Sequence, residues 1–242
     1  MEELPRGLHE ALVTEGLRAR LVALPDPDAV EQRALAAAEA ADRIAWHVSR
    51  EIERSLADVK EDDRAQVGID VARSLLQRLG DLVTTDPSAL PVESAMVLET
   101  VLSRRLDGSL EPIERPMIPL LDTTLLTNAP GEPSLWSQLR SEIDSADRVD
   151  VIMAFIRRSG IAPLLDALRR HTEKGRRLRV LTTTYTGSTE KTALDLLVDL
   201  GAEVRVSYDV TTTRLHAKAW VFHRATGIST AYVGSSNLTH SA

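Results

Sequence analysis

Two short groups of polar residues near the end of the sequence have the side chains needed for chemistry on a phosphate group. In residues 214–222, strand alternation places His216 and Lys218 on one face, side by side. An imidazole can act as a nucleophile or carry a proton, while a neighbouring ammonium neutralises phosphoryl charge. The second group is Gly234-Ser235-Ser236-Asn237, in which glycine allows close backbone approach and the hydroxyl and amide groups can donate to phosphate oxygens.

Neither group is informative alone, because His-x-Lys occurs by chance and the glycine-led group is typical of a turn that ends a strand. The intervening residues 223–228 are short enough for an antiparallel hairpin, which would bring Ser235 and Asn237 next to His216 and Lys218. We therefore predict a single site. Its catalytic residues would be His216, Lys218, Asn237 and Ser235, and its substrate-binding residues would include Gly234 and Ser236.

The second half of the sequence alternates between strand-like and helix-like segments. Gly175 and Gly201 end two of the helical segments. This alternation is typical of right-handed crossovers in a mainly parallel sheet covered by helices, so we predict an α/β fold. The predicted helices are 135–143, 161–171 and 189–200, and the predicted strands are 149–155, 178–183, 203–206, 215–222 and 229–235.

Two loops that follow predicted parallel strands could also bind an anion. One carries Thr184 and Thr186 and opens a helix, and the other carries Arg157 and Arg158. We include all four as substrate-binding candidates, although a solvated turn and surface charges explain them about equally well. Trp220 and Phe222 could stack on a base, but core packing is the favoured interpretation. His223, which directly follows the predicted strand, is either a substitute member of the site or the first residue of the hairpin, and we favour the hairpin because alternation places His223 on the face opposite His216.

The first half is rich in Ala and Leu and shows helical periodicity. Apolar residues recur at three- and four-residue steps after Pro25 and Pro27, again between Val67 and Leu82, and a third time between Pro91 and Gly108. We predict a helical bundle domain over 1–110. A proline-rich connector follows over 111–133, whose apolar residues indicate that it packs on another surface, and the α/β domain occupies 134–242.

Composition and charge narrow the possible functions. Cysteine is absent, which excludes disulfides, thiolate metal sites and a cysteine nucleophile. Residues 1–125 hold 24 acidic and 14 basic residues, a charge of −10, whereas 126–242 hold 12 and 15, a charge of +3. The second half is thus compatible with an anionic partner such as nucleic acid. The sequence shows no signal peptide and no membrane span, so a cytoplasmic location is expected.

The HxK and GSxN groups resemble the motif of the phospholipase D superfamily, which runs HxK, four residues, Asp and then GSxN. Here His223 stands where the family has Asp, and the stretch before Gly234 is longer. The segments 120–135, 150–161, 181–189 and 214–238 also look like the nuclease-like N-terminal module of large bacterial superfamily two helicases. The sequence has no GxxxxGK[ST] phosphate loop. Because residues 239–242 directly follow the motif, we expect the domain to be incomplete at its C-terminal end.

The resemblance implies that the domain is a phosphodiesterase, and specifically a nuclease that acts on DNA. It also implies that the enzyme needs no metal or other cofactor. In such enzymes one histidine forms a phosphohistidine and a second protonates the leaving oxygen. The sequence has a single HxK, so the resemblance implies a homodimer that joins two copies of His216. It further implies a helicase motor as partner, no membrane association, and a role in genome defence, including antiphage defence, or in repair.

Other interpretations stay open at this stage. The domain could be a catalytically silent module, degraded at His223, that binds nucleic acid or dimerises. The acidic helical half could instead be autoinhibitory and mimic DNA. Strand preference, base specificity and the role of residues 1–110 do not follow from the sequence.

Overall fold

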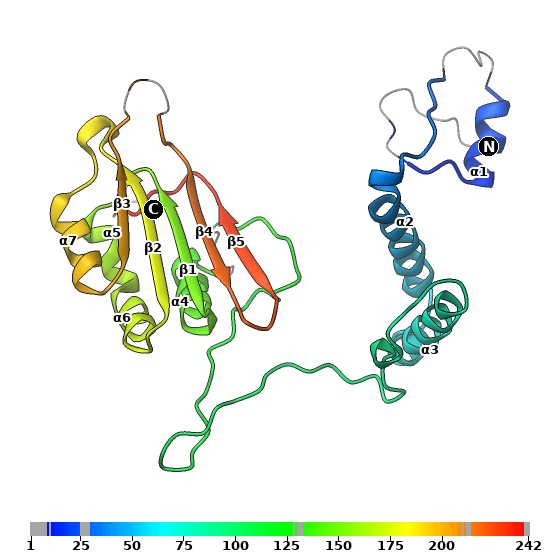
Figure 1. Ribbon diagram of the computed structural model, residues 1–242, viewed down its shortest axis with the longest axis horizontal. Helices are drawn as coiled ribbons and strands as arrows, with labels where there is room; N and C mark the ends of the chain where they lie inside the picture. The colour runs from blue at the N-terminus through cyan, green and yellow to red at the C-terminus, as the bar shows by residue number, and fades with distance from the viewer. Residues whose placement is uncertain are drawn as a thin grey trace. The chain divides into compact units, whose positions relative to one another are not determined.

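The computed structural model describes residues 9, 11–24, 30–127, 129, 133–209, 211 and 214–239 (Figure 1). The chain divides into two compact units, Met1–Thr100 and Val101–Ala242. The predicted breaks at Pro25, Pro27, Pro130 and Gly131 lie outside the described residues. Within the described ranges, no helix has both the length and the apolar character needed to cross a membrane.

The N-terminal unit is helical, as the periodicity predicts. It contains α1 (Glu15–Val22), α2 (Ala37–Ala57), α3 (Glu61–Gly80) and the short 3-10 helix η2 (Pro87–Ala89). Gly68 of α3 allows close contact with Leu56 of α2, because a β-carbon at Gly68 would lie 3.4 Å from Leu56 Cδ1. None of the residues in these three α-helices is buried, so they do not enclose a bundle core.

The helix predicted between Pro91 and Gly108 does not form. Residues 91–108 are extended or turn-like, Ala95 has a positive φ of 50°, and Arg104 and Leu110 form an isolated antiparallel bridge. Exposure explains the difference, since Met96, Val97 and Val101 are 73–82% exposed. A short helix is only marginally stable in water unless its apolar face packs on another surface. The helical periodicity of these residues is therefore not sufficient for a helix to form.

The C-terminal unit contains a five-stranded mixed sheet with the order β3-β2-β1-β4-β5. Strands β1, β2 and β3 are parallel, whereas β4 is antiparallel to both β1 and β5. The predicted alternation and the hairpin are therefore confirmed. The elements are α4 (Leu135–Ser145), β1 (Arg148–Met153), α5 (Arg158–Ile161), η3 (Ala162–Leu164), α6 (Leu165–Glu173), β2 (Arg177–Thr183), η4 (Tyr185–Gly187), α7 (Lys191–Asp199), β3 (Glu203–Ser207), β4 (Lys218–His223) and β5 (Ser229–Val233).

The hydrophobic core lies between one face of the sheet and its helices. Every second residue of β1 and β4 is buried, and the register pairs Val151 with Trp220 and Val149 with Phe222. Gly175 and Gly201 end α6 and α7 with φ values of 72° and 90°, which favour glycine. Trp220 is 6% exposed and Phe222 is fully buried, so the core interpretation of both residues is confirmed.

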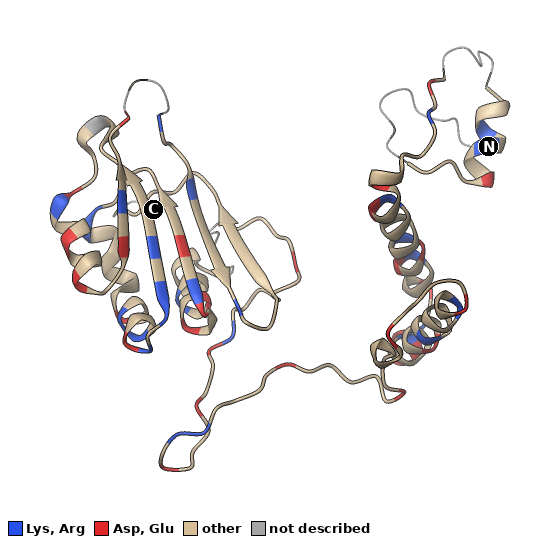
Figure 2. Ribbon diagram, in the orientation of Figure 1, with Lys and Arg blue, Asp and Glu red and all other residues tan. Residues whose placement is uncertain are grey.

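The opposite face of the sheet carries no helix from the described residues of the C-terminal unit, and the strands there are open to view in Figure 1. Charged residues on β1 and β2 mark this face (Figure 2). Asp150 binds Arg179 through both carboxylate oxygens. The Arg179 guanidinium holds the pKa of the Asp150 carboxyl below its usual range, while partial burial opposes this shift. A cross-strand ion pair thus occupies the middle of the open face.

A buried polar cluster fastens α4 to the last two strands. The Glu142 carboxylate, 1% exposed, accepts hydrogen bonds from Arg224, from Thr230 Oγ1 at 2.7 Å and from the Tyr232 hydroxyl at 3.0 Å. Burial, together with the Glu142 charge, raises the pKa of Tyr232. The Glu142 carboxylate therefore has one charged and two neutral donors, which offset much of the desolvation cost of burying it, whereas Arg224 Nε has no hydrogen-bond partner among the described residues.

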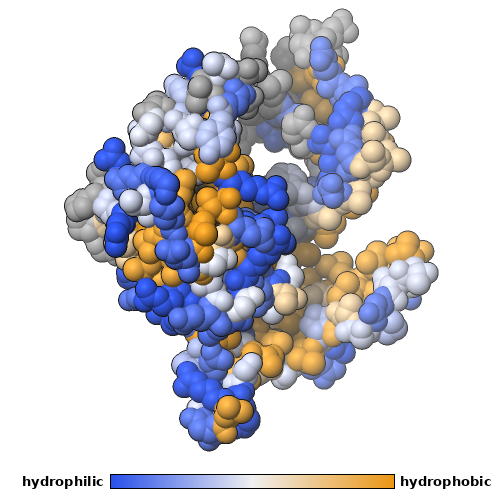
Figure 3. All heavy atoms as spheres, turned by 60° about the vertical axis from the view of Figure 1, so that its left-hand side comes forward, coloured by the Kyte–Doolittle hydropathy of each residue, from blue (hydrophilic) through white to orange (hydrophobic). Residues whose placement is uncertain are grey.

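Two polar contacts hold the connector to the α/β unit. Lys174 pairs with Glu111, and Ser141 Oγ donates to Glu114 at 3.1 Å. By contrast, the apolar side chains Met117, Leu121 and Leu125 are 70–85% exposed. Figure 3 shows hydrophobic residues gathered in contiguous areas that hydrophilic residues border.

Candidate active site at one edge of the sheet

The predicted site residues meet at a single edge of the sheet. Parallel strands β1 and β2 end there, and β4 begins there because it runs antiparallel to β1, with Met153 paired to Lys218. Strand β5 ends at the same edge, next to the start of β4. Loops that follow the carboxyl ends of parallel strands are the usual ligand-binding positions of open α/β sheets. The topology therefore explains how residues far apart in the sequence converge.

His216 and Lys218 are in direct contact. Lys218 Nζ lies 3.0 Å from His216 Nδ1 and 3.4 Å from Nε2, and it donates to the His216 carbonyl oxygen at 2.8 Å. His216 precedes β4 and is exposed, whereas Lys218 is 8% exposed. The rings of His216 and Phe155 also form a T-shaped contact, with a centroid separation of 5.7 Å. A fixed, nearly buried ammonium beside an accessible imidazole is suited to binding an anion that the imidazole attacks.

The backbone places the Gly234–Asn237 segment beside this pair. The amide of Gly234 donates to the carbonyl oxygen of Lys218 at 3.1 Å. Ser235 and Ser236 are exposed, and Asn237 is half-buried with a buried Oδ1 that has no hydrogen-bond partner among the described residues. A rotation of the amide by 180° would present Nδ2 there instead. Asn237 thus has unused hydrogen-bonding capacity, as expected for a residue that holds a ligand.

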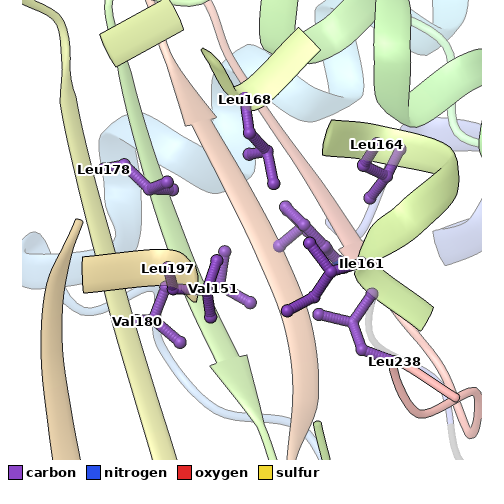
Figure 4. Close-up of a pocket in the computed structure, with 9 residues that line it drawn as sticks. Val151, Ile161, Leu164, Leu168, Leu178, Val180, Leu197 and Leu238 are labelled. Carbon is purple, nitrogen blue, oxygen red and sulfur yellow. The ribbon is translucent and has the colours of Figure 1, made fainter. Parts of the chain in front are cut away.

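Leu238 anchors the segment to the core. Its side chain lines a small, wholly apolar pocket with Val151, Ile161 and Leu164 (Figure 4). Its carbonyl oxygen accepts from the Arg157 amide at 2.7 Å, and it forms a parallel bridge with Ile156. This pocket offers no polar group to a ligand. Instead, the pocket holds Leu238 in place and thereby helps to position the preceding residue, Asn237.

Gly160 is a positioning residue that the sequence patterns did not predict. A β-carbon at this position would lie 2.0 Å from the carbonyl carbon of Leu238 and 2.4 Å from the nitrogen of Thr239. Only glycine permits this approach of α5 to the segment that carries Asn237. A glycine at the start of a helical segment was the available signal, although the sequence does not reveal what it approaches.

We expect Gly160→Ala to push Leu238 and Thr239 away from α5. Overpacking of this kind lowers the free energy of unfolding by about 1–3 kcal/mol, and a displacement near 1 Å in a site can lower a rate on the order of 100-fold. Urea unfolding measures the first effect, and the rate of phosphodiester cleavage measures the second. Gly234→Ala is the stability control, because no atom of the described residues lies within 4 Å of the place that its β-carbon would take. Equal unfolding midpoints for Gly160→Ala and wild type would contradict this prediction.

The other substrate-binding candidates lie along the same edge. The Thr184 amide donates to Ser207, and Thr184 is exposed. Thr186 belongs to η4, but its side chain is outside the described part of the structure. Arg157 and Arg158 are exposed where β1 leads into α5. The amide of Arg158 is already bound to Glu190 Oε2 at 2.9 Å, so any anion there would contact the guanidinium groups instead.

His223 lies outside this constellation. It ends β4 on the open face, where Nε2 lies 3.0 Å from Asp150 Oδ2. Strand alternation predicts that it lies on the face opposite His216, and its contact with Asp150 occurs on that face. Among the described residues, no group of three or more His, Asp and Glu side chains is arranged to hold a metal ion.

The fold and the motif define an α/β domain of a type that acts on phosphodiesters. Residues 139–242 match a protein family described as "Cardiolipin synthase, PLD-like domain". This part of the chain is a phospholipase D superfamily domain, as the resemblance implies. No curated protein matches the chain. Among solved structures, polyphosphate kinase from Porphyromonas gingivalis matches with 16% identity and a TM-score of 0.32, over 43% of this chain and 18% of that one.

Proposed function

We propose that the domain is a metal-independent phosphodiesterase that cleaves DNA through a phosphohistidine intermediate. The contact between His216 and the nearly buried Lys218 ammonium is the main support. A phosphate oxygen bound next to the His216 ring would accept a hydrogen bond from Lys218, and Asn237 and Ser235 could hold the remaining oxygens. Gly234, Ser236, Thr184, Thr186, Arg157 and Arg158 would bind the substrate around this centre.

The proposed reaction has two steps. A ring nitrogen of His216 attacks phosphorus, a phosphorus–nitrogen bond forms, and the bond from phosphorus to the leaving oxygen breaks. A second histidine donates a proton to that oxygen. Water then attacks phosphorus, gives up a proton to the second histidine, and frees His216. Since the sequence contains one HxK, the second histidine is proposed to be His216 of another copy in a homodimer.

The wider setting is also a proposal. On the resemblance to helicase-associated modules, we propose that the domain belongs to a larger bacterial helicase-nuclease of the cytoplasm, with a motor as partner and a role in genome defence or repair. A silent binding or dimerisation module is the second candidate. The position of His223 favours that candidate, because it replaces the family's Asp and is engaged with Asp150 instead.

Chelation distinguishes metal-independent cleavage from metal-dependent chemistry. We expect wild-type protein to cleave labelled single- or double-stranded DNA at an unchanged rate in excess EDTA, because Lys218 and not a metal ion neutralises the phosphate. Light scattering on the same sample measures the dimer. Loss of cleavage in EDTA would contradict the proposed reaction. DNA binding without any cleavage, in a protein shown to be dimeric, would favour the silent module.

A further inference from the structure

Three aromatic residues follow the ends of neighbouring strands at the site edge. Phe155 follows β1, Tyr185 follows β2 and Tyr208 follows β3. The amide of Thr184 donates to the Ser207 carbonyl at 3.2 Å, which keeps the ends of β2 and β3 together. Neighbouring strands lie about 4.8 Å apart, so the series from Tyr208, after β3, to His216, just before β4, spans on the order of 14 Å. We call Phe155, Tyr185 and Tyr208 the aromatic row.

The aromatic row is accessible, unlike Trp220 and Phe222 in the core of the sheet. Tyr208 is 76% exposed, and Phe155 and Tyr185 are half-buried. Trp220 and Phe222, by contrast, lie in the core and cannot stack on a ligand. At the end of the row nearest the site, the Phe155 ring contacts the His216 ring. A ligand lying along the row would therefore reach the reactive histidine.

Cations accompany the row. The Arg214 guanidinium lies 5.4 Å from the centroid of the Tyr185 ring, and the exposed residues Arg157 and Arg158 follow Phe155 closely in the sequence. Two acidic groups lie near these residues. Glu190 is held by the Arg158 amide, and Asp209 accepts from the Thr211 amide at 3.1 Å. Aromatic faces interleaved with guanidinium groups bind bases by stacking and the backbone by charge.

We infer that the aromatic row binds the unpaired bases of single-stranded nucleic acid and leads the strand to His216. This inference deepens the proposed function, because it names single strands as the substrate class. Bases in a duplex are already stacked on each other, so their faces are not free for Tyr185 or Tyr208. Stacking on aromatic side chains tolerates any base, and the row is therefore expected to bind without sequence preference.

Fluorescence anisotropy in EDTA tests the inference with the His216→Ala protein, which cannot form the proposed intermediate. The probes are a labelled single strand, the same strand with consecutive abasic sites, and the matching duplex. We expect binding of the intact single strand to be at least about 10-fold tighter than that of either other probe. Tyr185→Ala and Tyr208→Ala should each weaken binding of the intact strand by about 10-fold, and leave abasic binding unchanged.

Tyr185→Phe and Tyr208→Phe are the matched controls, because phenylalanine keeps the stacking face and should restore affinity. Unfolding midpoints confirm that the alanine variants are folded. Equal affinity for intact and abasic strands, tighter binding to duplex, or no effect of either alanine variant would overturn the inference. If the wild-type protein cleaved single strands and duplexes equally well, the inference about the aromatic row would be refuted, whereas the proposed nuclease activity would be supported. If single strands bound through the aromatic row but the wild-type protein did not cleave them, the inference about the row would be supported, whereas the proposed nuclease activity would be refuted.

Discussion

His216→Ala is expected to lower the rate of DNA cleavage on the order of 10⁴-fold or more, the usual cost of removing a covalent nucleophile. Affinity for DNA should change only a few-fold, because Lys218, Asn237 and the exposed arginines remain. The structure explains why no other group substitutes for His216. Its ring is the only imidazole that the described residues place in contact with Lys218. Single-turnover cleavage and anisotropy measure rate and affinity separately.

His223→Ala provides the matched histidine control. His223 belongs to the same strand-forming segment but contacts Asp150 on the open face. We expect cleavage by this variant to stay within about 3-fold of wild type, since the proposed chemistry does not use His223. A loss comparable to that of His216→Ala would contradict this assignment. It would show that the position occupied by Asp in the family still acts in the reaction.

Glu142→Ala is expected to lower the free energy of unfolding of the C-terminal unit by about 3–5 kcal/mol. The carboxylate neutralises Arg224, whose side chain is only 6% exposed, and accepts from Thr230 and Tyr232. Its removal leaves a buried guanidinium without its charge partner, and two hydroxyl groups lose an acceptor. Urea unfolding should be followed by tryptophan fluorescence in a Trp46→Phe background, so that only Trp136 and Trp220 report.

Two variants test whether burial causes this effect. Asp166→Ala removes an exposed ion pair, 3.6 Å from Arg169, and should change the free energy of unfolding by about 0.5 kcal/mol or less. The double replacement of Glu142 and Arg224 by methionine should be less destabilising than Glu142→Ala alone, because no unpaired charge remains. If Glu142→Ala and Asp166→Ala were equally mild, the buried cluster would not be a major source of stability.

The main features of the C-terminal fold follow from local patterns. Strand and helix periods differ, and Gly175 and Gly201 mark where helices end, so the alternation of elements was predictable. The hairpin followed from the six residues that separate its strands. Once those strands pair, His216, Lys218 and Gly234 must share an edge. The proximity of the two motifs was therefore accessible from the sequence.

Contacts between residues far apart in the sequence could not be predicted from local patterns. Glu142 and Arg224 are far apart in the sequence, and no local pattern indicates that they meet in the core. Position 160 must be glycine because the carbonyl group of Leu238 comes very close to it. This approach exists only in the folded domain, so no local sequence pattern indicates it. The aromatic row depends on strand order, because its members follow three different strands. Residues 91–108 show the reverse case, in which a helical pattern lacks the packing surface that would stabilise it.

The central claim is that His216 attacks phosphorus, and trapping of the intermediate tests it most directly. DNA labelled internally with ³²P is mixed with protein in EDTA, the reaction is quenched with denaturant at alkaline pH, and protein-bound label is measured. We predict label on wild-type and His223→Ala protein, lost on mild acid treatment as expected for phosphohistidine, and none on His216→Ala. Label retained by His216→Ala, or cleavage by wild type without bound label under single-turnover conditions, would contradict the assignment of His216 as the nucleophile.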